Sequence, residues 1–187
     1  MKILIRGGHV IDPANNIDQV RDLFIDDSRI VDSQLAGSDF TADQTIDATG
    51  KVVCPGLIDL QARLREPGEE HKATMQSELS AAVAGGVTSV CVPPDTNPVI
   101  DTPAMVHMVR QRGRRIEKAR VYPLGALTIG LKGEQLTDMA TLRDAGCTAL
   151  SNVDRSIDNT LVMRRAMQHA FRPAITAWYR RDHPGCW

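Results

Sequence analysis

The sequence predicts an α/β protein: the first half of an eight-fold βα barrel, preceded by a small β module. From Val52 onward, short apolar runs alternate four times with helical segments, and this rhythm is typical of a parallel sheet or barrel. Before Val52 the apolar runs are short and separated by turns, without helical periodicity. An open doubly wound sheet is the alternative, because spacing alone does not separate the two topologies.

Residues 1–51 are expected to form the small module, an incomplete β-sandwich. Gly7-Gly8 is interpreted as a turn after the first strand, and Asp12–Asn16 is a strong turn signal. Asp26–Arg29 suits a hairpin turn. The expected strands lie at residues 3–5, 10–11, 20–25, 30–31 and 45–48.

Residues 52–170 are expected to hold four βα units. Gly85-Gly86 and Gly146 are helix stop signals, and Pro103 suits the first turn of a helix. The predicted strands are 52–60, 87–92, 120–124 and 147–150, and the predicted helices are 69–84, 102–115, 134–145 and 158–170.

The tail, residues 171–187, breaks this rhythm. It contains both tryptophans and lacks the pattern of a barrel strand. A complete barrel takes about 250 residues, so roughly half of one is expected here. A truncated product with no function of its own is therefore one alternative.

Composition narrows the possible functions. A net charge of -1 and a pI near 6.5 give no electrostatic reason to expect binding to nucleic acid or to an anionic membrane. No apolar run is long enough to span a bilayer, and residues 1–6 are too short for a signal peptide. The cysteines are far apart and are predicted to be reduced and buried in a cytoplasmic protein, with zinc binding as the minor alternative: Cys54, Cys91, Cys147 and Cys186.

The segment PGLIDLQARLREPG, residues 55–68, is the most informative stretch. An apolar strand is followed by residues that are alternately polar and apolar, as at the mouth of a barrel. Gln61 and Arg63 lie one residue apart, the spacing at which two side chains on a strand point the same way and can bind one metal. Neither an amide nor a guanidinium is a usual zinc ligand. The arginine also brings a fixed positive charge, which is unfavourable for binding a divalent cation.

The chain resembles the cyclic amidohydrolases: the dihydroorotases and their allantoinase and hydantoinase relatives. Motifs similar to theirs occur in the same order from residue 1 to about 170, which implies an amidohydrolase-type (β/α)8 TIM barrel. These motifs are IRGGHVIDP at 5–13, PGLIDL at 55–60, LREPG at 64–68, AAVAGGVT at 81–88, PDTNP at 94–98, YPLGALT at 122–128 and LRDAGC at 142–147.

The resemblance implies that the zinc ligands are degenerate. The family pattern P-G-x-I-D-x-H-x-H-x-R-E-P-G places its two histidines at Gln61 and Arg63. The acidic ligand of strand four, in a pattern like S-D-D-G, falls on Asn152 or Val153, and Asp154 is a weak candidate for a displaced acid.

Two further positions relate to substrate binding in the resembled family. Arg65 matches the arginine that binds the substrate carboxylate, although an ion pair with Glu66 or a contact to a helix end is an equal alternative. The substrate-binding asparagine falls on Asp95, whose charge would repel an anionic substrate. Arg65 and Asp95 are therefore possible residues of a residual anion site.

These changes favour a non-catalytic protein. The family hydrolyses a ring amide with a zinc-activated water, and no cofactor is expected here. The resemblance extends to inactive dihydroorotase-like chains that support aspartate carbamoyltransferase in pyrimidine biosynthesis, so that enzyme is the expected partner. An active zinc hydrolase with unusual ligands is the alternative. Half a barrel exposes strand edges, which predicts an oligomer.

Overall fold

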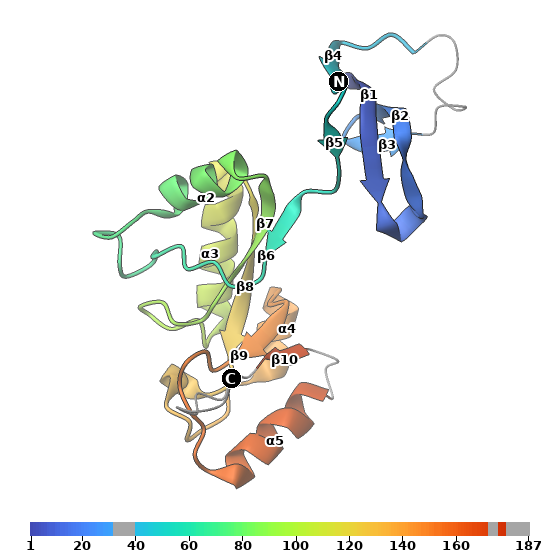
Figure 1. Ribbon diagram of the computed structural model, residues 1–187. Helices are drawn as coiled ribbons and strands as arrows, with labels where there is room; N and C mark the ends of the chain where they lie inside the picture. The colour runs from blue at the N-terminus through green and yellow to red at the C-terminus, as the bar shows by residue number, and fades with distance from the viewer. Residues whose placement is uncertain (32–39, 172–175, 179–187) are drawn as a thin grey trace. The chain divides into compact units, whose positions relative to one another are not determined.

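The computed structural model describes residues 1–31, 40–171 and 176–178 of the chain. The chain divides into two compact units, Met1–Pro55 and Gly56–Trp187, which can be followed by colour in Figure 1. In these ranges no helix combines the length and the apolar character that crossing a membrane requires.

The first unit is a five-stranded mixed sheet. Its strands are β1 (Lys2–Asp12), β2 (Ile17–Asp26), β3 (Arg29–Val31), β4 (Gln44–Asp47) and β5 (Val52–Val53). β1, β2 and β3 pair antiparallel, whereas β4 and β5 both pair parallel with β1. The described part of this unit is thus rich in strands, and a single sheet holds all five of them.

The interpretation of Gly7-Gly8 as a turn is wrong. Both glycines lie inside β1, where the pairing with β2 shifts register between Ile5 and Gly8 and Gly7 has φ 67°. A Cβ on Gly8 would lie 2.6 Å from a methyl carbon of Val53. Arg6 and Gly7 together lie opposite Asp22 and so form a bulge within one long strand, and Gly8 lets β5 approach closely.

The barrel begins later than the sequence pattern predicts. Val52 and Val53 pair with His9 and Val10 of β1, so they belong to the first unit. The first strand of the second unit is β6 (Leu57–Asp59). Pro55 lacks the N–H that a ladder needs, and it separates two strands that look like one apolar run. The two units consequently divide after Pro55 and not after residue 51.

The second unit is a parallel sheet in the order β10-β9-β8-β7-β6. The further strands are β7 (Val87–Val92), β8 (Arg120–Ala126), β9 (Ala149–Ser151) and β10 (Thr176–Trp178), and the helices are α2 (Met75–Ala84), α3 (Pro103–Ile116), α4 (Met139–Ala145) and α5 (Thr160–Phe171). Each strand pairs with the next one along the chain, with a helix in each connection (Figure 1). The prediction of the first half of a barrel is confirmed.

The tail contributes one strand that the pattern does not predict. Thr176, Ala177 and Trp178 pair parallel with Ala149–Ser151 of β9. Three residues are too few to show a strand periodicity, which is why this continuation of the sheet was not predicted. The expectation for residues 172–175 and 179–187 lies outside the described residues.

Two helices begin later than predicted because their caps decide the first turn. Thr74 accepts a hydrogen bond from the Ser77 N–H, and the Ser77 hydroxyl accepts one from the Thr74 N–H. This capping box starts α2 at Met75 and not at residue 69. Asp138 likewise accepts from the Thr141 N–H, so α4 starts at Met139 and not at residue 134.

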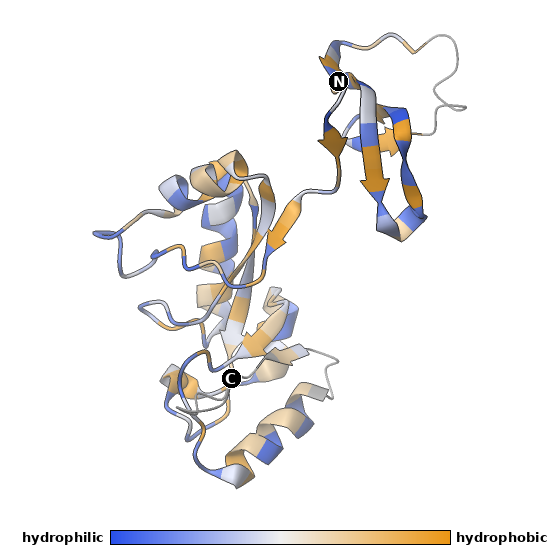
Figure 2. Cartoon of the chain, in the orientation of Figure 1, coloured by the Kyte–Doolittle hydropathy of each residue, from blue (hydrophilic) through white to orange (hydrophobic). Residues whose placement is uncertain are grey.

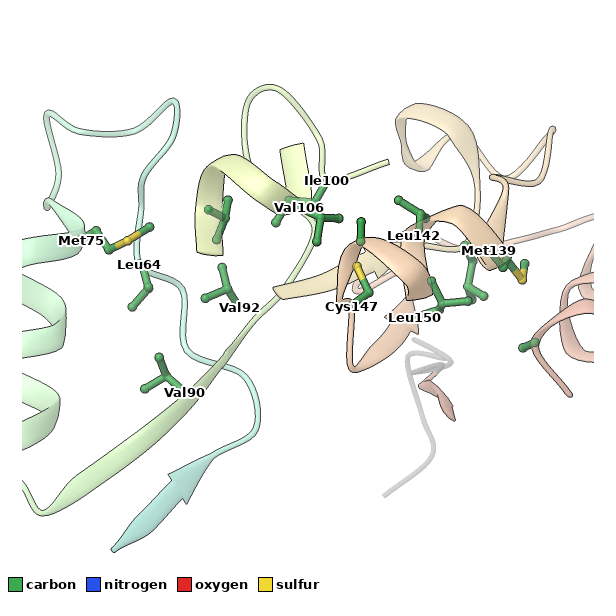
Figure 3. Packing of buried hydrophobic residues seen from close by; sticks show 14 of the residues in the cluster. Leu64, Met75, Val90, Val92, Ile100, Val106, Met139, Leu142, Cys147 and Leu150 are labelled. Atoms are coloured by element: carbon green, nitrogen blue, oxygen red, sulfur yellow. The ribbon is translucent and has the colours of Figure 1, made fainter. Parts of the chain in front are cut away.

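The main core lies between the parallel sheet and its helices. Val90 and Val92 of β7 contribute to it, together with residues of α2, α3 and α4 (Figure 3). Between them in sequence, Cys91 belongs to a smaller cluster with Leu124 and Ala149, since successive strand residues point to opposite faces. Leu64, in the segment after β6, is buried in the main core and holds that segment against the sheet.

The cysteines differ in exposure. Cys91 and Cys147 are buried, and desolvation raises the pKa of the Cys147 thiol to about 12, so it stays protonated at neutral pH. Cys54 is exposed, which corrects the expectation that it is buried, because it lies between β5 and β6 and not within a strand. Cys186 lies outside the described residues.

The edge strand β6 exposes apolar side chains. Leu57 and Ile58 of β6, and Leu60 just after it, keep 57%, 63% and 55% of their surface exposed. Figure 2 shows most of β6 in the hydrophobic colour. Such an uncovered edge is what half a barrel is expected to leave. The predicted oligomer remains a prediction.

Candidate functional site

A cavity of about 380 Å³ lies in the second unit at the carboxyl ends of β6, β7 and β9. This is the end of a parallel barrel at which binding and catalytic residues are found. Charged side chains dominate its lining: Arg63, Arg65, Glu69, Asp95, Asp154 and Arg155.

Arg63 joins the ends of three strands. Its Nε donates to Asp95 Oδ2 and its Nη2 donates to Asp154 Oδ2, each over 2.7 Å. Arg63 follows β6, Asp95 follows β7 and Asp154 follows β9. The hydrogen bond to Asp95, together with the two negative charges, raises the pKa of Arg63. The guanidinium is therefore a fixed cation held between two carboxylates.

Gln61 takes no part in this arrangement. Its backbone N–H donates to Asp59 Oδ1 over 2.8 Å, and its side chain is exposed. Across the described ranges, no group of three or more histidine, cysteine or acidic side chains is placed to hold a metal ion. The residues present do not fit zinc, because the position that would supply a second ligand holds a cation that is already paired.

Arg65 lines the cavity and is paired with Glu69, which lines the same cavity. It has φ 62°, an uncommon conformation for a residue with a side chain, and its Nη1 donates to Glu69 Oε2 over 2.9 Å. Lys72 contacts the same carboxylate, and these two cations lower the pKa of Glu69. The alternative of an ion pair between Arg65 and Glu66 is wrong.

Glu66 has a different role, which the sequence did not reveal. Its side chain is buried, accepts a hydrogen bond from the Met75 N–H at the start of α2 over 2.7 Å, and forms an ion pair with Arg112 of α3. A carboxylate at a helix N-terminus is favourable for the helix dipole. Glu66 thus fixes the segment that carries Arg63 and Arg65 onto two helices.

Asn152 builds the turn after β9. It is fully buried, its Oδ1 accepts from the Thr128 hydroxyl over 2.8 Å, and its Nδ2 donates to the Arg155 carbonyl over 3.1 Å. Val153, the next residue, has φ 50°, which is strained for a β-branched side chain. Its N–H donates to the Ser151 hydroxyl over 2.9 Å. The surrounding hydrogen bonds hold this turn and so place Asp154 and Arg155 at the cavity.

The structure therefore brings together three of the positions selected from sequence, Arg63, Asp95 and Asp154, and places Arg65 at the same cavity. Asn152 and Val153 lie beneath it as buried residues of a turn. The sequence did not indicate Arg155, which directly follows Asp154 and also lines the cavity.

The model of the family described as dihydro-orotase-like matches residues 50–183. The chain belongs to the dihydroorotase-like family. A dihydroorotase-like protein of Pseudomonas aeruginosa is 48% identical over 170 residues, which cover 91% of this chain and 40% of that protein. A dihydroorotase of Syntrophotalea carbinolica is 43% identical over 172 residues, with the same two shares. This dihydroorotase-like chain thus spans about 40% of the length of these relatives.

Solved structures share the fold of the dihydroorotase-like chain. An L-hydantoinase (dihydropyrimidinase) from Arthrobacter aurescens superposes with a TM-score of 0.81 at 16% identity, covering 97% of this chain and 41% of that one. A dihydroorotase superposes with a TM-score of 0.66 at 14% identity, covering 98% and 52%. At these identities the likeness shows the fold, and it agrees with the first half of an amidohydrolase barrel preceded by a sheet module.

The Arg63 pairings predict a measurable loss of stability in the variant Arg63→Met. Without the guanidinium, Asp95 and Asp154 would face each other unneutralised across the cavity. Because all three side chains are partly exposed, we expect the free energy of unfolding to fall by only about 1–2 kcal/mol. Denaturant unfolding measures this value, and added salt should reduce the difference from wild type.

The matched control for Arg63→Met is Arg164→Met. Arg164 is an exposed arginine of α5, and the described residues offer it no hydrogen bond or ion pair. A loss of stability that is equal in both variants would mean that the pairings of Arg63 contribute nothing.

Proposed function

We propose that this dihydroorotase-like chain is non-catalytic and serves as a structural component of pyrimidine biosynthesis that supports aspartate carbamoyltransferase. The observation that supports the proposal is the position of Arg63. At the mouth of the barrel, the guanidinium of Arg63 lies between Asp95 and Asp154, with one nitrogen 2.7 Å from a carboxylate oxygen of each.

Zinc hydrolysis needs an ion that binds a water and lowers its pKa, held by at least three protein ligands. A divalent ion next to Arg63 would be repelled by the guanidinium and would have to displace it from both carboxylates. Gln61, the other residue of the pair, is an exposed amide. The charge of Arg63 and the amide of Gln61 therefore favour a protein that does not catalyse zinc-dependent hydrolysis.

The residues that maintain the scaffold favour a role based on shape. Leu64 is buried in the core, and Glu66 binds both α2 and α3. The LREPG motif therefore has a structural role that does not depend on catalysis. The two Pseudomonas relatives named dihydroorotase-like protein are each 48% identical, whereas relatives named dihydroorotase are 39% to 44% identical. The greater similarity to the former supports the proposal.

We place the contact with the transferase on the β module and the outer helices. In the module, Val20 and Ile30 are 71% and 69% exposed on β2 and β3. Ile30 pairs with Ile25, and Val20 lies five residues before Ile25 in β2, so the two side chains are separate contact points and not one patch. The mouth of the barrel, with its paired charges, is less suited to such a contact.

The proposal is tested by mixing the chain with aspartate carbamoyltransferase, followed by gel filtration and by assay of transferase activity. We expect a larger species and a transferase that is more active or more stable in the mixture. The double variant Val20→Asp/Ile30→Asp should abolish both effects, whereas the control Asn97→Asp, at an exposed residue of the loop after β7, should leave complex formation unchanged. If the transferase has the same size and activity without the chain, the structural role is refuted.

A further inference from the structure

Four cations of the second unit gather where α3 ends and β8 begins: Arg114, Arg115, Lys118 and Arg120. We propose that these residues, the α3-end patch, bind an acidic segment of a partner protein. The inference is independent of the proposed role in pyrimidine biosynthesis, because it rests on the charges of this surface and defines the partner only by its chemistry.

The α3-end patch carries an excess of positive charge. Residues 114–120 hold the four cations and a single anion, Glu117, so the net charge of this segment is +3. All five charged side chains are exposed, and the described residues offer them no hydrogen bond or ion pair. The charge of the patch is therefore available to a partner.

The arginines earlier in α3 differ from the patch because they have structural partners. Arg110 Nη1 donates to the Ala145 carbonyl at the end of α4 over 2.8 Å. Arg112 pairs with the buried carboxylate of Glu66. Packing of the fold accounts for these two arginines, whereas it gives the side chains of the patch no contact of this kind.

The helix dipole accounts for only half of the patch. Arg114 and Arg115 lie in the last turn of α3, where cations are favourable. Lys118 and Arg120 lie beyond the end of the helix at Ile116, so the dipole gives them no comparable benefit. Their charges need another explanation, and an anionic partner supplies one.

The backbone directs the cations of the patch toward solvent. Glu117 has φ 54°, and its N–H donates to the Arg114 carbonyl over 3.3 Å, so the chain turns at this residue from α3 toward β8. Ala119 is buried in the main core, and its neighbours Lys118 and Arg120 are exposed. The turn is thus anchored between these two cations, which keeps them beside the end of α3.

The helix that carries the patch is packed tightly on β8. Gly113 is buried, and a Cβ at this position would lie 2.5 Å from a methyl carbon of Val121. Val106 and Val109, on the same side of α3, are also fully buried. Because rigid elements carry the patch, mainly its side chains lose freedom when a partner binds, and this lowers the entropic cost of the contact.

Apolar side chains are exposed at the same end of the parallel sheet. The strands β6, β7 and β8 run parallel, so their first residues and the carboxyl ends of α2 and α3 lie at this end (Figure 1). Val83 near the end of α2 is 44% exposed, and Leu57 at the start of β6 is 57% exposed. Protein interfaces combine apolar and charged contacts, which favours a protein as the partner.

The charge of the rest of the chain favours a short acidic segment over a nucleic acid or an anionic membrane. Residues 1–55 hold nine aspartates and no glutamate, against five lysines and arginines, so their net charge is -4. The whole chain has a net charge of -1. An extended polyanion would meet repulsion outside the patch, whereas a segment with a few carboxylates would contact the patch alone.

The test measures binding of the 187-residue chain to a fluorescent octapeptide of alternating glutamate and leucine. The comparison peptide has glutamine in place of each glutamate. The acidic peptide should bind saturably, and the glutamine peptide should bind at least about tenfold more weakly, because it lacks charge-assisted hydrogen bonds. Raising the salt concentration from about 0.05 to about 0.5 M should weaken only the acidic peptide.

Two double variants with the same change in net charge separate the patch from the overall charge. Arg115→Glu/Lys118→Glu should weaken binding of the acidic peptide at least about tenfold. Arg164→Glu/Arg165→Glu, at two exposed arginines of α5, should change it less than about threefold, since salt screens distant charges. Thermal unfolding checks that each variant is folded. Lys118→Gln/Arg120→Gln leaves α3 unaltered and should weaken the acidic peptide by about threefold or more.

Four results would overturn the proposal: no saturable binding of the acidic peptide, equal binding of the two peptides, an equal loss in the patch and α5 variants, or unchanged binding in both patch variants. A single-stranded DNA octamer serves as the rival probe. If it binds more tightly than the acidic peptide and is lost in Arg115→Glu/Lys118→Glu, the surface is assigned to nucleic acid instead.

Discussion

The 187-residue chain should show no dihydroorotase activity and should retain no stoichiometric zinc after washing with a chelator. The expected deficit is at least about a million-fold relative to a zinc enzyme, since that is the lower limit of ordinary enzymatic rate enhancement. The reason is that Arg63 occupies the ligand position and holds Asp95 and Asp154 as its own partners. Assay of ring opening and metal analysis on the same sample measure both quantities.

Restoring the two histidines should not restore this chemistry. In Gln61→His/Arg63→His the new side chain at position 63 would line the cavity with Asp95 and Asp154, whereas position 61 does not line it, so the two imidazoles would not both be placed to hold one ion there. Turnover by this double variant would contradict the expectation. Stoichiometric zinc in the wild-type chain that is lost in Asp154→Ala would favour an active hydrolase with unusual ligands.

The second large effect is expected from Asn152→Leu. The variant keeps the volume of the side chain but removes an acceptor for the Thr128 hydroxyl and a donor to the Arg155 carbonyl. Both partners would be left unsatisfied in or near a buried turn, at about 1–3 kcal/mol each, so a loss of about 3 kcal/mol in the free energy of unfolding is expected. The strained Val153 is held by the same turn, so it should lose its conformation as well.

Denaturant unfolding with Gln111→Leu as the control tests this. Gln111 is exposed on α3 and should tolerate the same change within about 0.5 kcal/mol. Asn152→Leu should also raise the mobility of Arg155, which backbone relaxation measurements would detect. A variant as stable as wild type would show that the Thr128 and Arg155 hydrogen bonds contribute no net stability.

The alternation of parallel strands and helices in the second unit could be predicted from sequence, because each βα unit carries its own local start and stop signals. Thr102 and Pro103 start α3 as expected, and Gly146 ends α4 as expected. Val52 and Val53 were assigned to the wrong sheet because an apolar pair looks the same in any sheet. Its partner, His9–Val10, is more than forty residues away in sequence, and only the tertiary fold selects it.

The site was predictable one residue at a time but not as an arrangement. Arg63, Asp95 and Asp154 each stood out singly, yet the partners are 32 and 91 positions apart in sequence, which conceals that one guanidinium reaches both carboxylates. Asn152 was noticed as a degenerate metal position, whereas its actual function in a buried turn depends on Thr128, 24 residues earlier. Glu66 and Arg112 were missed for the same reason.

The cation between Asp95 and Asp154 is covalently part of the polypeptide. A protein whose strand ends are joined by a bound ion depends on the supply of that ion in the cell and competes for it with other metalloproteins. Here the joining group is synthesised with the chain, in a fixed ratio of one per molecule, and a chelator cannot remove it. Folding of this arrangement of Arg63, Asp95 and Asp154 should therefore proceed equally well under zinc starvation.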